Sequence, residues 1–342
     1  MTDNRYLVTG GLGYIGSVVV EELVREGAQV VVVDNGLSGT APSTDPRVHT
    51  VIADVRDPLC LDEVIVGVDG VIHLAGIVGD RACDMDHAFT WDTNYLATVY
   101  VANACKRAGV RRMVFASTCS NYGWSCGQAA DVLSPLRPLS VYAESKVRAE
   151  HHLLAARDDE FSPCILRLAT IFGVSPRMRF DLVVNVMTAH AVTRGQVLVH
   201  GGDQWRPFIH VRDAAGMMIS ALTAEPRNHA EIYNCGSDRE NYRLLDLGLL
   251  VAAEVGGVEV LVNPTLDDER DYRVSFDAVS DALGYECGRS VADGVHEVRD
   301  AVKSGLYPDI TAEIYDDYQL TRRYLGARDI PAPRHARAMS VR

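Results

Sequence analysis

The sequence lacks the marks of a membrane-spanning, metal-binding or disulfide-stabilised protein. No uninterrupted apolar run approaches the roughly 20 residues that a membrane-spanning helix needs. The eight cysteines are scattered, without a C-x-x-C pair or a His/Cys cluster at metal-ligand spacing. The first strand pattern begins within a few residues of Met1 and leaves no room for a signal peptide. We therefore expect a soluble, cytoplasmic protein with no metal and no disulfides.

Basic residues are also few. The 342 residues include 33 Lys and Arg against 46 Asp and Glu, which gives a formal net charge of -13. Nucleic acid and anionic membranes repel an acidic protein, so neither is an expected partner. A small anionic ligand stays possible, because a local cluster of basic side chains can oppose the global charge.

The first half of the chain alternates short β-branched runs with longer helical patterns, which is typical of βαβ units around a parallel sheet. The expected strands are 6–11, 29–34, 49–55, 70–76, 111–118 and 164–173. The main expected helices are 15–26, 86–108 and 141–157. The pattern predicts an α/β fold with a Rossmann-type, doubly wound parallel sheet, whose ligand lies at the carboxyl ends of the strands.

The alternation loosens after about Ser175, where a smaller, interleaved second domain is expected. SPRMRF and GGDQWRPF are interpreted as loops, EIYNCG as a late strand that could rejoin the main sheet, and 244–255 and 258–263 as a helix and a strand. We assign residues 1–174 to the first domain, with 205–236 returning to it. Residues 175–204 and 237–328 form the substrate-binding domain. The basic, non-periodic segment 329–342 is expected to be a flexible tail.

A glycine motif separates the first strand from the first helix. TGGLGYIG places Gly10, Gly13 and Gly16 as G-x-x-G-x-x-G. A tight turn, a close approach of the backbone to a pyrophosphate, and close packing of helix on strand each exclude a side chain. The N–H groups and positive dipole end of the helix then face the phosphates. Because strand, turn and helix occur in the required order, the motif predicts a dinucleotide site rather than a structural turn alone.

An aspartate ends the second strand. Asp34 stands where a carboxylate can accept hydrogen bonds from both ribose hydroxyls of the adenosine half. It would repel a 2′-phosphate, and the next residues, NGLSGTAPSTDP, include no Arg or Lys to bind one. NAD is therefore expected rather than NADP, with a solvated turn aspartate as the alternative. Asp54 and Val55 follow the third strand and suit the adenine, although Asp54 could instead cap the next helix.

Two hydroxyl-bearing motifs suggest the chemistry. VYAESK supplies Tyr142 and Lys146 four residues apart, hence on one helix face. A phenol of pKa about 10 must lose about 3 units, or about 4 kcal/mol, to act as a base at neutral pH. A neighbouring ammonium and a positive nicotinamide ring are possible sources. FASTCSNYG brings Ser117 and Thr118 to the end of the fifth strand, where a hydroxyl could steer the substrate proton to Tyr142. A role only in capping the turn is the alternative, above all for Ser117.

These motifs, with ADV, HLAG, RLATIFG and RPFIHVRD, resemble those of the extended short-chain dehydrogenases/reductases. The resemblance is to the NAD-dependent epimerase/dehydratase branch, and to nucleotide-sugar 4-epimerases in particular, and it runs from Tyr6 to about Leu325. It implies that Thr118, Tyr142 and Lys146 are the catalytic residues and that Lys146 also binds the nicotinamide ribose. The implied partners are a nucleotide-diphosphate sugar and a second copy of the chain. The dimer would pair helices 86–108 and 141–157, where Val99, Val101, Ala102, Leu153 and Leu154 offer apolar surface for that contact or for the core.

The resemblance also implies the remaining site residues. The expected cofactor contacts, besides Tyr142 and Lys146, are Gly10, Gly13, Tyr14, Ile15, Asp34, Asn35, Asp54, Val55, Leu74, Ala75, Gly76, Asn94 and Ser117. The expected substrate contacts are Thr118, Asn185, Arg206, Arg270 and Arg273. Arginine suits a diphosphate through its fixed fork of donors. Whether Arg270 or Arg273 aligns with the second phosphate-binding arginine stays open. The alternative for all three arginines is a surface salt bridge without a role in substrate binding. The alternative for Asn94 is a purely structural role.

One departure from the family concerns the reaction. Sugar 4,6-dehydratases carry an acidic pair directly after the catalytic threonine, where this chain has Cys119 and Ser120. Serine is far too weak a base, and a thiol has a reference pKa of about 8.5. The expected reaction is therefore epimerisation, with C4 as the leading position. A dehydratase using Cys119, a decarboxylase or a reductase is the alternative, and a non-catalytic NAD-binding regulator is a remote one.

Overall fold

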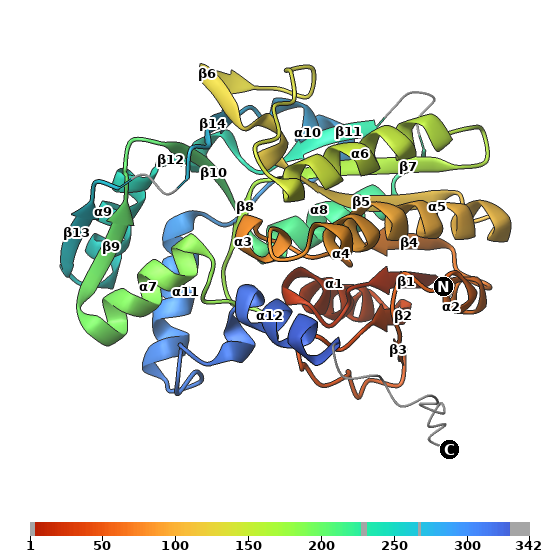
Figure 1. The fold of residues 1–342 in the computed structure, drawn as a ribbon, viewed down its shortest axis with the longest axis horizontal. Coiled ribbons are helices and arrows are strands. Elements are labelled where there is room, and N and C mark those ends of the chain that lie inside the picture. Colours follow the sequence, from red (N-terminus) through yellow and green to blue (C-terminus); the bar gives the residue numbers. More distant parts are fainter. Residues whose placement is uncertain (1–3, 227–230, 266–267, 329–342) are drawn as a thin grey trace.

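A seven-stranded parallel sheet forms the centre of the computed structural model, which describes residues 4–226, 231–265 and 268–328 (Figure 1). The strand order is β11-β7-β5-β4-β1-β2-β3. The strands are β1 (Arg5–Thr9), β2 (Gln29–Asp34), β3 (Val48–Ile52), β4 (Gly70–His73), β5 (Arg112–Thr118), β7 (Ser162–Leu168) and β11 (Glu231–Cys235). This order is doubly wound, and the Rossmann-type prediction is confirmed.

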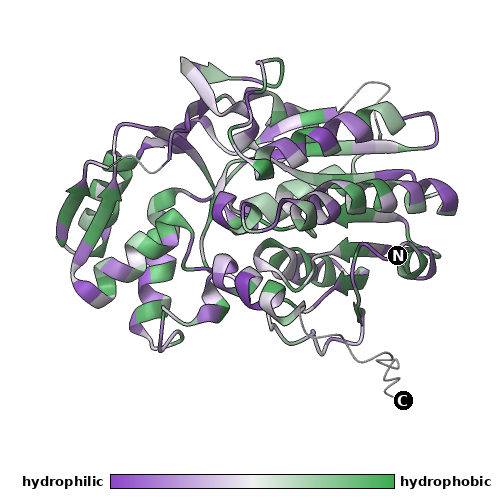
Figure 2. Cartoon of the chain, viewed as in Figure 1, coloured by the Kyte–Doolittle hydropathy of each residue, from purple (hydrophilic) through white to green (hydrophobic). Residues whose placement is uncertain are grey.

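Helices cover both faces of the sheet. On one face α1 (Tyr14–Arg25) packs beside α8 (Val211–Thr223), and on the other lie α2 (Pro58–Val64), α5 (Ala97–Ala108) and α6 (Val141–Ala156). The strands between them are strongly apolar, whereas the helices carry hydrophilic residues on their outer sides (Figure 2). Strands buried on both faces read as continuous hydrophobic runs, which explains why the sequence revealed them so clearly.

The helix predicted over 86–108 is one rod with a change of winding. It consists of α4 (His87–Trp91), a π-helical turn (Asp92–Leu96) and α5, and the side chain of Asp86 caps its start by accepting from Phe89 N. A π turn inserts one extra residue per turn and often marks a functional site. Here it carries Asn94, which lies buried beneath the pocket described below.

The second half builds a smaller lobe with a separate apolar core. Its helices are α7 (Val183–Arg194), α9 (Leu244–Val255) and α11 (Val291–Lys303), whereas α10 (Asp277–Leu283) packs against α8 and against β11 of the main sheet. Its small sheets pair β8 (Thr170–Phe172) with β10 (Trp205–His210) and β12 (Asn241–Arg243), and β9 (Gln196–His200) with β13 (Glu259–Asn263). A further pair, β6 (Trp124–Ala130) and β14 (Asp271–Val274), joins the two halves.

Two sequence interpretations are corrected here. The strand predicted over 164–173 is divided into β7 and β8, because the chain leaves the main sheet after Leu168. GGDQWRPF is not all loop, because its second half begins strand β10. Partners from distant segments, β8 and β12, make this a strand, and a polar local sequence cannot reveal them.

Only part of segment 205–236 returns to the main sheet. Helix α8 packs against the sheet and β11 extends it beside β7, whereas β10 pairs with β8 outside it. The late strand predicted in EIYNCG is thus confirmed, and the division into domains stays a prediction. The expected tail, 329–342, lies outside the described residues.

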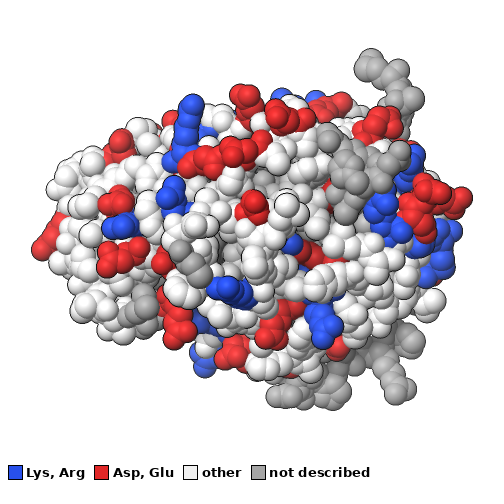
Figure 3. All heavy atoms as spheres, turned by 90° about the horizontal axis from the view of Figure 1, so that it is seen from above, with Lys and Arg blue, Asp and Glu red and all other residues white. Residues whose placement is uncertain are grey.

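The exterior is of mixed charge. On the face drawn in Figure 3, acidic and basic side chains are interspersed without a broad basic surface. Among the described residues, no helix is long and apolar enough to cross a membrane. In the same part of the chain, no group of three or more His, Cys, Asp or Glu side chains is arranged to hold a metal ion.

Candidate active site

The main pocket lies at the carboxyl edge of the sheet, where the strand order reverses between β1 and β4. From β1 the chain builds the sheet outward through β2 and β3, and then returns to place β4 on the other side of β1. The connections therefore diverge and leave a crevice, the usual ligand position in open α/β sheets. The lining includes the glycine turn, the ends of β2, β4 and β5, the start of α6, and residues of the small lobe.

The glycine turn is packed as tightly as a dinucleotide cradle requires. Gly10 has φ +72°, and a Cβ there would lie 2.7 Å from Ala75 N of the neighbouring turn. A Cβ on Gly16 would lie 2.1 Å from Gly10 O. Side chains at these positions would force the two turns apart and move the N-terminus of α1. Gly13, Tyr14 and Ile15 line the pocket beside them, so the residues present fit a dinucleotide pyrophosphate.

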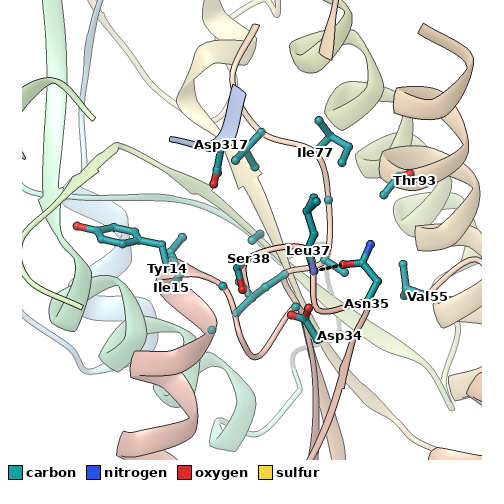
Figure 4. Close-up of a pocket in the computed structure, with 18 of the residues that line it drawn as sticks. Tyr14, Ile15, Asp34, Asn35, Leu37, Ser38, Val55, Ile77, Thr93 and Asp317 are labelled. Carbon is teal, nitrogen blue, oxygen red and sulfur yellow. Dashed lines mark hydrogen bonds between the residues drawn. The ribbon is translucent and has the colours of Figure 1, made fainter. Parts of the chain in front are cut away.

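At the end of β2, Asp34 ties the glycine turn to the following loop. Its carboxylate accepts from Leu12 N at 3.1 Å and from Gly36 N at 2.8 Å. Burial raises the pKa of Asp34, although these backbone bonds oppose the shift. Figure 4 shows Asp34 and Asn35 at the pocket wall, where Asn35 Oδ1 accepts from Leu37 N at 3.0 Å. Asp34 is therefore a partly buried, bonded residue, not a solvated turn aspartate.

The turn after β3 shows that the alternative role of Asp54, as a helix cap, is wrong. Asp54 does not cap the next helix, because the side chain of Asp57 caps α2 by accepting from Leu59 N. Asp54 instead pairs with Arg56, whose Nε lies 2.9 Å from Oδ1. Asp54 and the buried Val55 both line the pocket, as the adenine assignment requires. That assignment stays a prediction.

Two of the three predicted catalytic side chains, Tyr142 and Lys146, line the pocket, and Thr118 lies next to Tyr142 without being part of the lining. Tyr142 lies in the first turn of α6, whose start is capped by Ser140, and its phenol is near enough to Thr118 for that side chain to oppose the rise of the phenol pKa. Lys146 follows one turn later, with Nζ 6.0 Å from the Tyr142 ring centre and donating to Ala116 O at 2.9 Å. Thr118 also accepts from Ser120 N at 3.1 Å. Its hydroxyl thus caps the turn and lies near the phenol.

The charges of this cluster are set mainly by burial. Burial raises the pKa of the Tyr142 phenol above its usual 10, with Cys83 acting in the same direction and Thr118 opposing. Burial also lowers the pKa of Lys146 to about 8. The ammonium is directed at a backbone carbonyl rather than at the phenol oxygen. The chain by itself therefore does not lower the pKa of Tyr142.

A buried chain of hydrogen bonds connects the ends of strands β1 and β4 to helix α5 beneath the cofactor region. Thr98 donates to Asn94 O at 2.8 Å and so accepts from His73 Nε2 at 3.0 Å, while His73 Nδ1 accepts from Thr9 at 2.6 Å. Burial, followed by the charge of Lys146, lowers the pKa of His73 to about 3, so this imidazole is neutral. His73 was not among the predicted site residues. A histidine inside the apolar run VIHLAG was the signal for it.

Asn94 joins this chain of hydrogen bonds to the turn after β4. Its side-chain amide accepts a hydrogen bond from Ile77 N at 2.7 Å and donates one to Ile77 O at 2.9 Å. It also donates to Ser145 Oγ at 3.2 Å. Leu74, Ala75 and Gly76 of the same turn line the pocket. Asn94 thus has a structural function here, and a direct cofactor contact stays a prediction.

A buried ion pair behind the catalytic turn was not predicted. Glu150 of α6 and Arg167 of β7 are both nearly inaccessible and are joined at 2.7 Å. Asn121 donates to the same carboxylate, and Ser117 is hydrogen-bonded to it. Cys119 donates its thiol to Arg167 O at 3.2 Å. Two signals pointed here: an arginine inside the apolar strand CILRL, and Glu150 one turn after Lys146 on the same helix face.

The predicted substrate arginines separate into two groups. Arg206 of β10 and Arg270 both pair with Asp268, at 2.8 and 2.6 Å, and Arg270 also reaches Asp80 at 3.0 Å. Burial alone would raise the pKa of Asp268, but the two guanidiniums more than offset it and keep that pKa below its usual range. Arg273 is exposed, and its guanidinium packs 4.8 Å from the ring of Trp205.

Asn185 lies between the two lobes with its side chain fully engaged. It accepts from Gly173 N at 3.0 Å and donates to Tyr14 OH at 3.1 Å and to Arg179 O at 2.9 Å. The segment SPRMRF, interpreted from the sequence as a loop, is a loop in the structure and places Arg177 and Arg179 in the pocket that holds the glycine turn. A diphosphate contact by Asn185 stays a prediction.

Comparison with known proteins agrees with this geometry. Residues 6–236 match the NAD dependent epimerase/dehydratase family. The chain belongs to this family. The UDP-glucose 4-epimerase of Streptomyces lividans is 30% identical over 251 residues, which cover 68% of this chain and 76% of that protein. The UDP-glucuronic acid decarboxylase 1 of Arabidopsis thaliana is 28% identical over 309 residues, 85% of this chain and 68% of that protein.

Among solved structures, MoeE5 in complex with UDP-glucose and NAD is similar over 89% of this chain and 100% of that one. Its TM-score is 0.78 and its sequence identity 27%. As a member of an NAD-dependent family, this chain is an enzyme whose cofactor is NAD. Family members act on nucleotide sugars by several reactions, because the relatives include both epimerases and a decarboxylase.

Proposed function

We propose that this enzyme is a nucleotide-sugar epimerase that inverts a hydroxyl-bearing carbon, most simply C4, of a sugar joined to a nucleoside diphosphate. The observation that carries the proposal is the placement of Tyr142 and Lys146 in the pocket of the glycine turn, with Thr118 next to the phenol and no carboxylate in the turn Cys119–Tyr122. The named 4-epimerase of Streptomyces lividans supports the same reaction.

In the proposed mechanism Tyr142 takes the proton of the sugar hydroxyl and later returns one. NAD, when bound, supplies the acceptor and donor of the hydride. Thr118 hydrogen-bonds the reacting hydroxyl and keeps it directed at the phenol oxygen. Because the chain alone keeps the pKa of Tyr142 high, the positive charge of the bound nicotinamide is needed, together with Lys146, to stabilise the phenolate.

The surroundings of Cys119 argue against dehydration through this thiol. The residue is 1% exposed, and its thiol donates to a backbone carbonyl instead of lining the pocket. Burial raises the pKa of Cys119 far above neutral pH. Ser120 next to it contacts Tyr272 OH at 3.3 Å. Neither side chain is a suitable acid or base for removing water from the sugar.

The substrate diphosphate is assigned to Arg206 and Arg270. Their shared partner Asp268 holds them side by side, and Arg270 extends to Ser120 in the catalytic turn, at 3.3 Å from Oγ. Arg273 has no such link and stacks on Trp205 instead. We therefore choose Arg270 over Arg273 as the second phosphate-binding arginine.

The test is incubation with a panel of nucleotide sugars in heavy water, followed by mass spectrometry and proton NMR of the products. Epimerisation predicts an unchanged mass with an inverted coupling pattern. Loss of carbon dioxide from a nucleotide-linked uronic acid would instead establish the second candidate, a decarboxylase, which the Arabidopsis thaliana relative favours. Loss of water would establish a dehydratase, and either result would overturn epimerisation.

We also propose that the enzyme is a homodimer that pairs α5 and α6 with their copies. Val101, Ala102 and Leu153 are buried in the core of one chain and cannot take part, whereas Leu96 is 36% exposed and Val99 and Leu154 are partly exposed. Light scattering should give twice the mass of one chain at micromolar concentration. A single-chain mass there would contradict the proposal.

A further inference from the structure

Arg177 is a buried cation with unused hydrogen-bond donors. It lies in the loop between β8 and α7, and its side chain is 4% exposed. Its Nη2 donates to Asp317 at the start of α12 (Asp317–Arg328). Within the described part of the chain, Nε and Nη1 are buried and have no hydrogen-bond partner. A buried charged donor without an acceptor is costly, so an acceptor from a ligand is expected at these two nitrogens.

The neighbouring Arg179 provides a contrast within the same loop. Its side chain is 12% exposed, and it also lines the pocket. Its Nε and Nη2 donate to Asp181 at 2.9 and 2.6 Å, and Nη1 lies 2.9 Å from Asp317. All three of its nitrogens therefore face carboxylates. The unused donors belong to Arg177 and are not a general property of this loop.

Three hydrogen bonds fasten Arg177 to the start of α1. Ser175 donates to Tyr14 O at 2.7 Å and contacts Ser17 Oγ at 3.0 Å, and Arg177 N donates to Ser175 Oγ at 3.3 Å. Helix α1 has no acidic residue in its first turn, so its positive dipole end is not neutralised by its own side chains. The guanidinium and the helix end thus converge on one part of the pocket, where an anion is favoured.

Across the pocket, α12 supplies the carboxylate that orients the guanidinium. Asp317 uses one oxygen for Arg177 and the other for Arg179, and Leu320 and Thr321 of α12 line the same pocket. In Figure 4, Asp317 lies on the opposite side of the pocket from Asp34. Arg179 is fully paired with Asp181 and Asp317, so a ligand phosphate would supply only the acceptor that Arg177 lacks.

We propose that Arg177 binds the diphosphate of NAD through Nε and Nη1, from the side of the pocket facing the glycine turn. The cofactor would then be held by backbone N–H groups of α1 on one side and by a guanidinium of the inter-lobe loop on the other. This inference concerns the NAD site and does not depend on which sugar reaction the enzyme catalyses. The sugar-nucleotide substrate is the other source of a diphosphate, and the glycine turn beside Arg177 favours NAD.

The test is calorimetric binding of NAD, ADP-ribose and UDP to the full-length protein and its Arg177→Met variant. Loss of charge-assisted bonds to phosphate should weaken NAD and ADP-ribose about ten- to a hundredfold and leave UDP within about twofold. Arg177→Lys should recover part of the affinity, because it keeps the charge. The matched control, Arg179→Met, removes a neighbouring guanidinium of similar burial and should change NAD affinity by less than about threefold.

Three outcomes would overturn the proposal: NAD affinity within twofold of the unchanged protein, an equal loss in Arg179→Met, or a loss confined to UDP. Removing Arg177 leaves one oxygen of Asp317 without its partner, and the single variant could fold poorly. The double variant Arg177→Met, Asp317→Asn removes both charges and is tested in the same way. An unchanged melting temperature without ligand, together with the loss of ADP-ribose binding, separates a binding role from a structural one.

Discussion

The two halves of the active site are built by different physical means. On the cofactor side, glycines bring backbone against backbone, and the contacts that hold them are hydrogen bonds between neighbouring turns. On the substrate side, charged side chains from distant segments neutralise one another, as Asp268 does for Arg206 and Arg270. The first kind of site depends on close backbone packing within the chain itself. Under the proposed function, a diphosphate would replace Asp268 as the partner of Arg206 and Arg270.

The largest effect is expected where both halves meet, at the phenol. Tyr142→Phe removes the proposed proton acceptor and keeps the ring, so turnover should fall about a hundred- to ten-thousandfold. NAD affinity should change little, since the glycine turn and Arg177 are untouched. Steady-state turnover and calorimetry on the same preparation measure the two effects. Near-normal turnover would show that another group takes the proton.

On the substrate side, Arg270→Ala should weaken a nucleotide sugar about ten- to a hundredfold, because it removes charge-assisted bonds to the diphosphate. Binding of NAD should be preserved, which distinguishes this half from the other. Arg273→Ala is the control, since that guanidinium is exposed and stacks on Trp205. Titration with the nucleotide sugar should give this control variant an affinity within about twofold of that of the unchanged enzyme. Equal losses in both variants would contradict the choice of Arg270.

The cofactor side should respond to pH through Lys146. Burial lowers its pKa to about 8 in the folded protein without ligand, against 10.5 for an ordinary lysine. The unfolded chain thus binds more protons between these values, and this group favours folding as pH rises through that window. The positive charge that NAD binding uses is lost over the same range. His73 and Cys83, with pKa values of about 3 and 12, stay neutral there.

Calorimetry from pH 7 to 9.5 should therefore show NAD affinity falling above pH 8, by up to about tenfold per unit. Deprotonation of Lys146 should not lower the melting temperature over this pH range, because this group favours folding as pH rises. Lys146→Met should bind NAD weakly at every pH and flatten the profile. A wild-type affinity that stays constant to pH 9.5 would contradict the assignment of the ammonium to the cofactor.

The smallest effect is expected at Cys119, which belongs to neither half. Cys119→Ala removes a buried thiol that donates to Arg167 O, at a cost in stability of about 1 kcal/mol. Turnover should stay within a few-fold of the unchanged enzyme. Thermal unfolding and turnover of this variant measure both quantities. A hundredfold loss of turnover without unfolding would restore the thiol to the chemistry and favour dehydration.

Prediction from sequence succeeded where local structure depends on neighbours along the chain. The turn between β1 and α1, the carboxylate ending β2 and the Tyr142–Lys146 spacing are each set within a few residues, and a glycine or a helical repeat reveals them. It failed where polar groups satisfy one another across the fold. The sequence predicts a loop for the first part of β10, because its strand partners β8 and β12 lie on other segments. It also allows Asp54 as the helix cap that Asp57 provides.

By itself the sequence determined the parallel sheet and the family and proposed the catalytic side chains, because buried strands and tight turns restrict residue type locally. Only the tertiary structure decided how charge is distributed. It brought Glu150 to Arg167, turned the thiol of Cys119 away from the pocket, chose Arg270 over Arg273 as the partner of Arg206, and left two donors of Arg177 without an acceptor. The reason is physical: an ion pair requires only that two charges meet in space, and their separation along the chain is free.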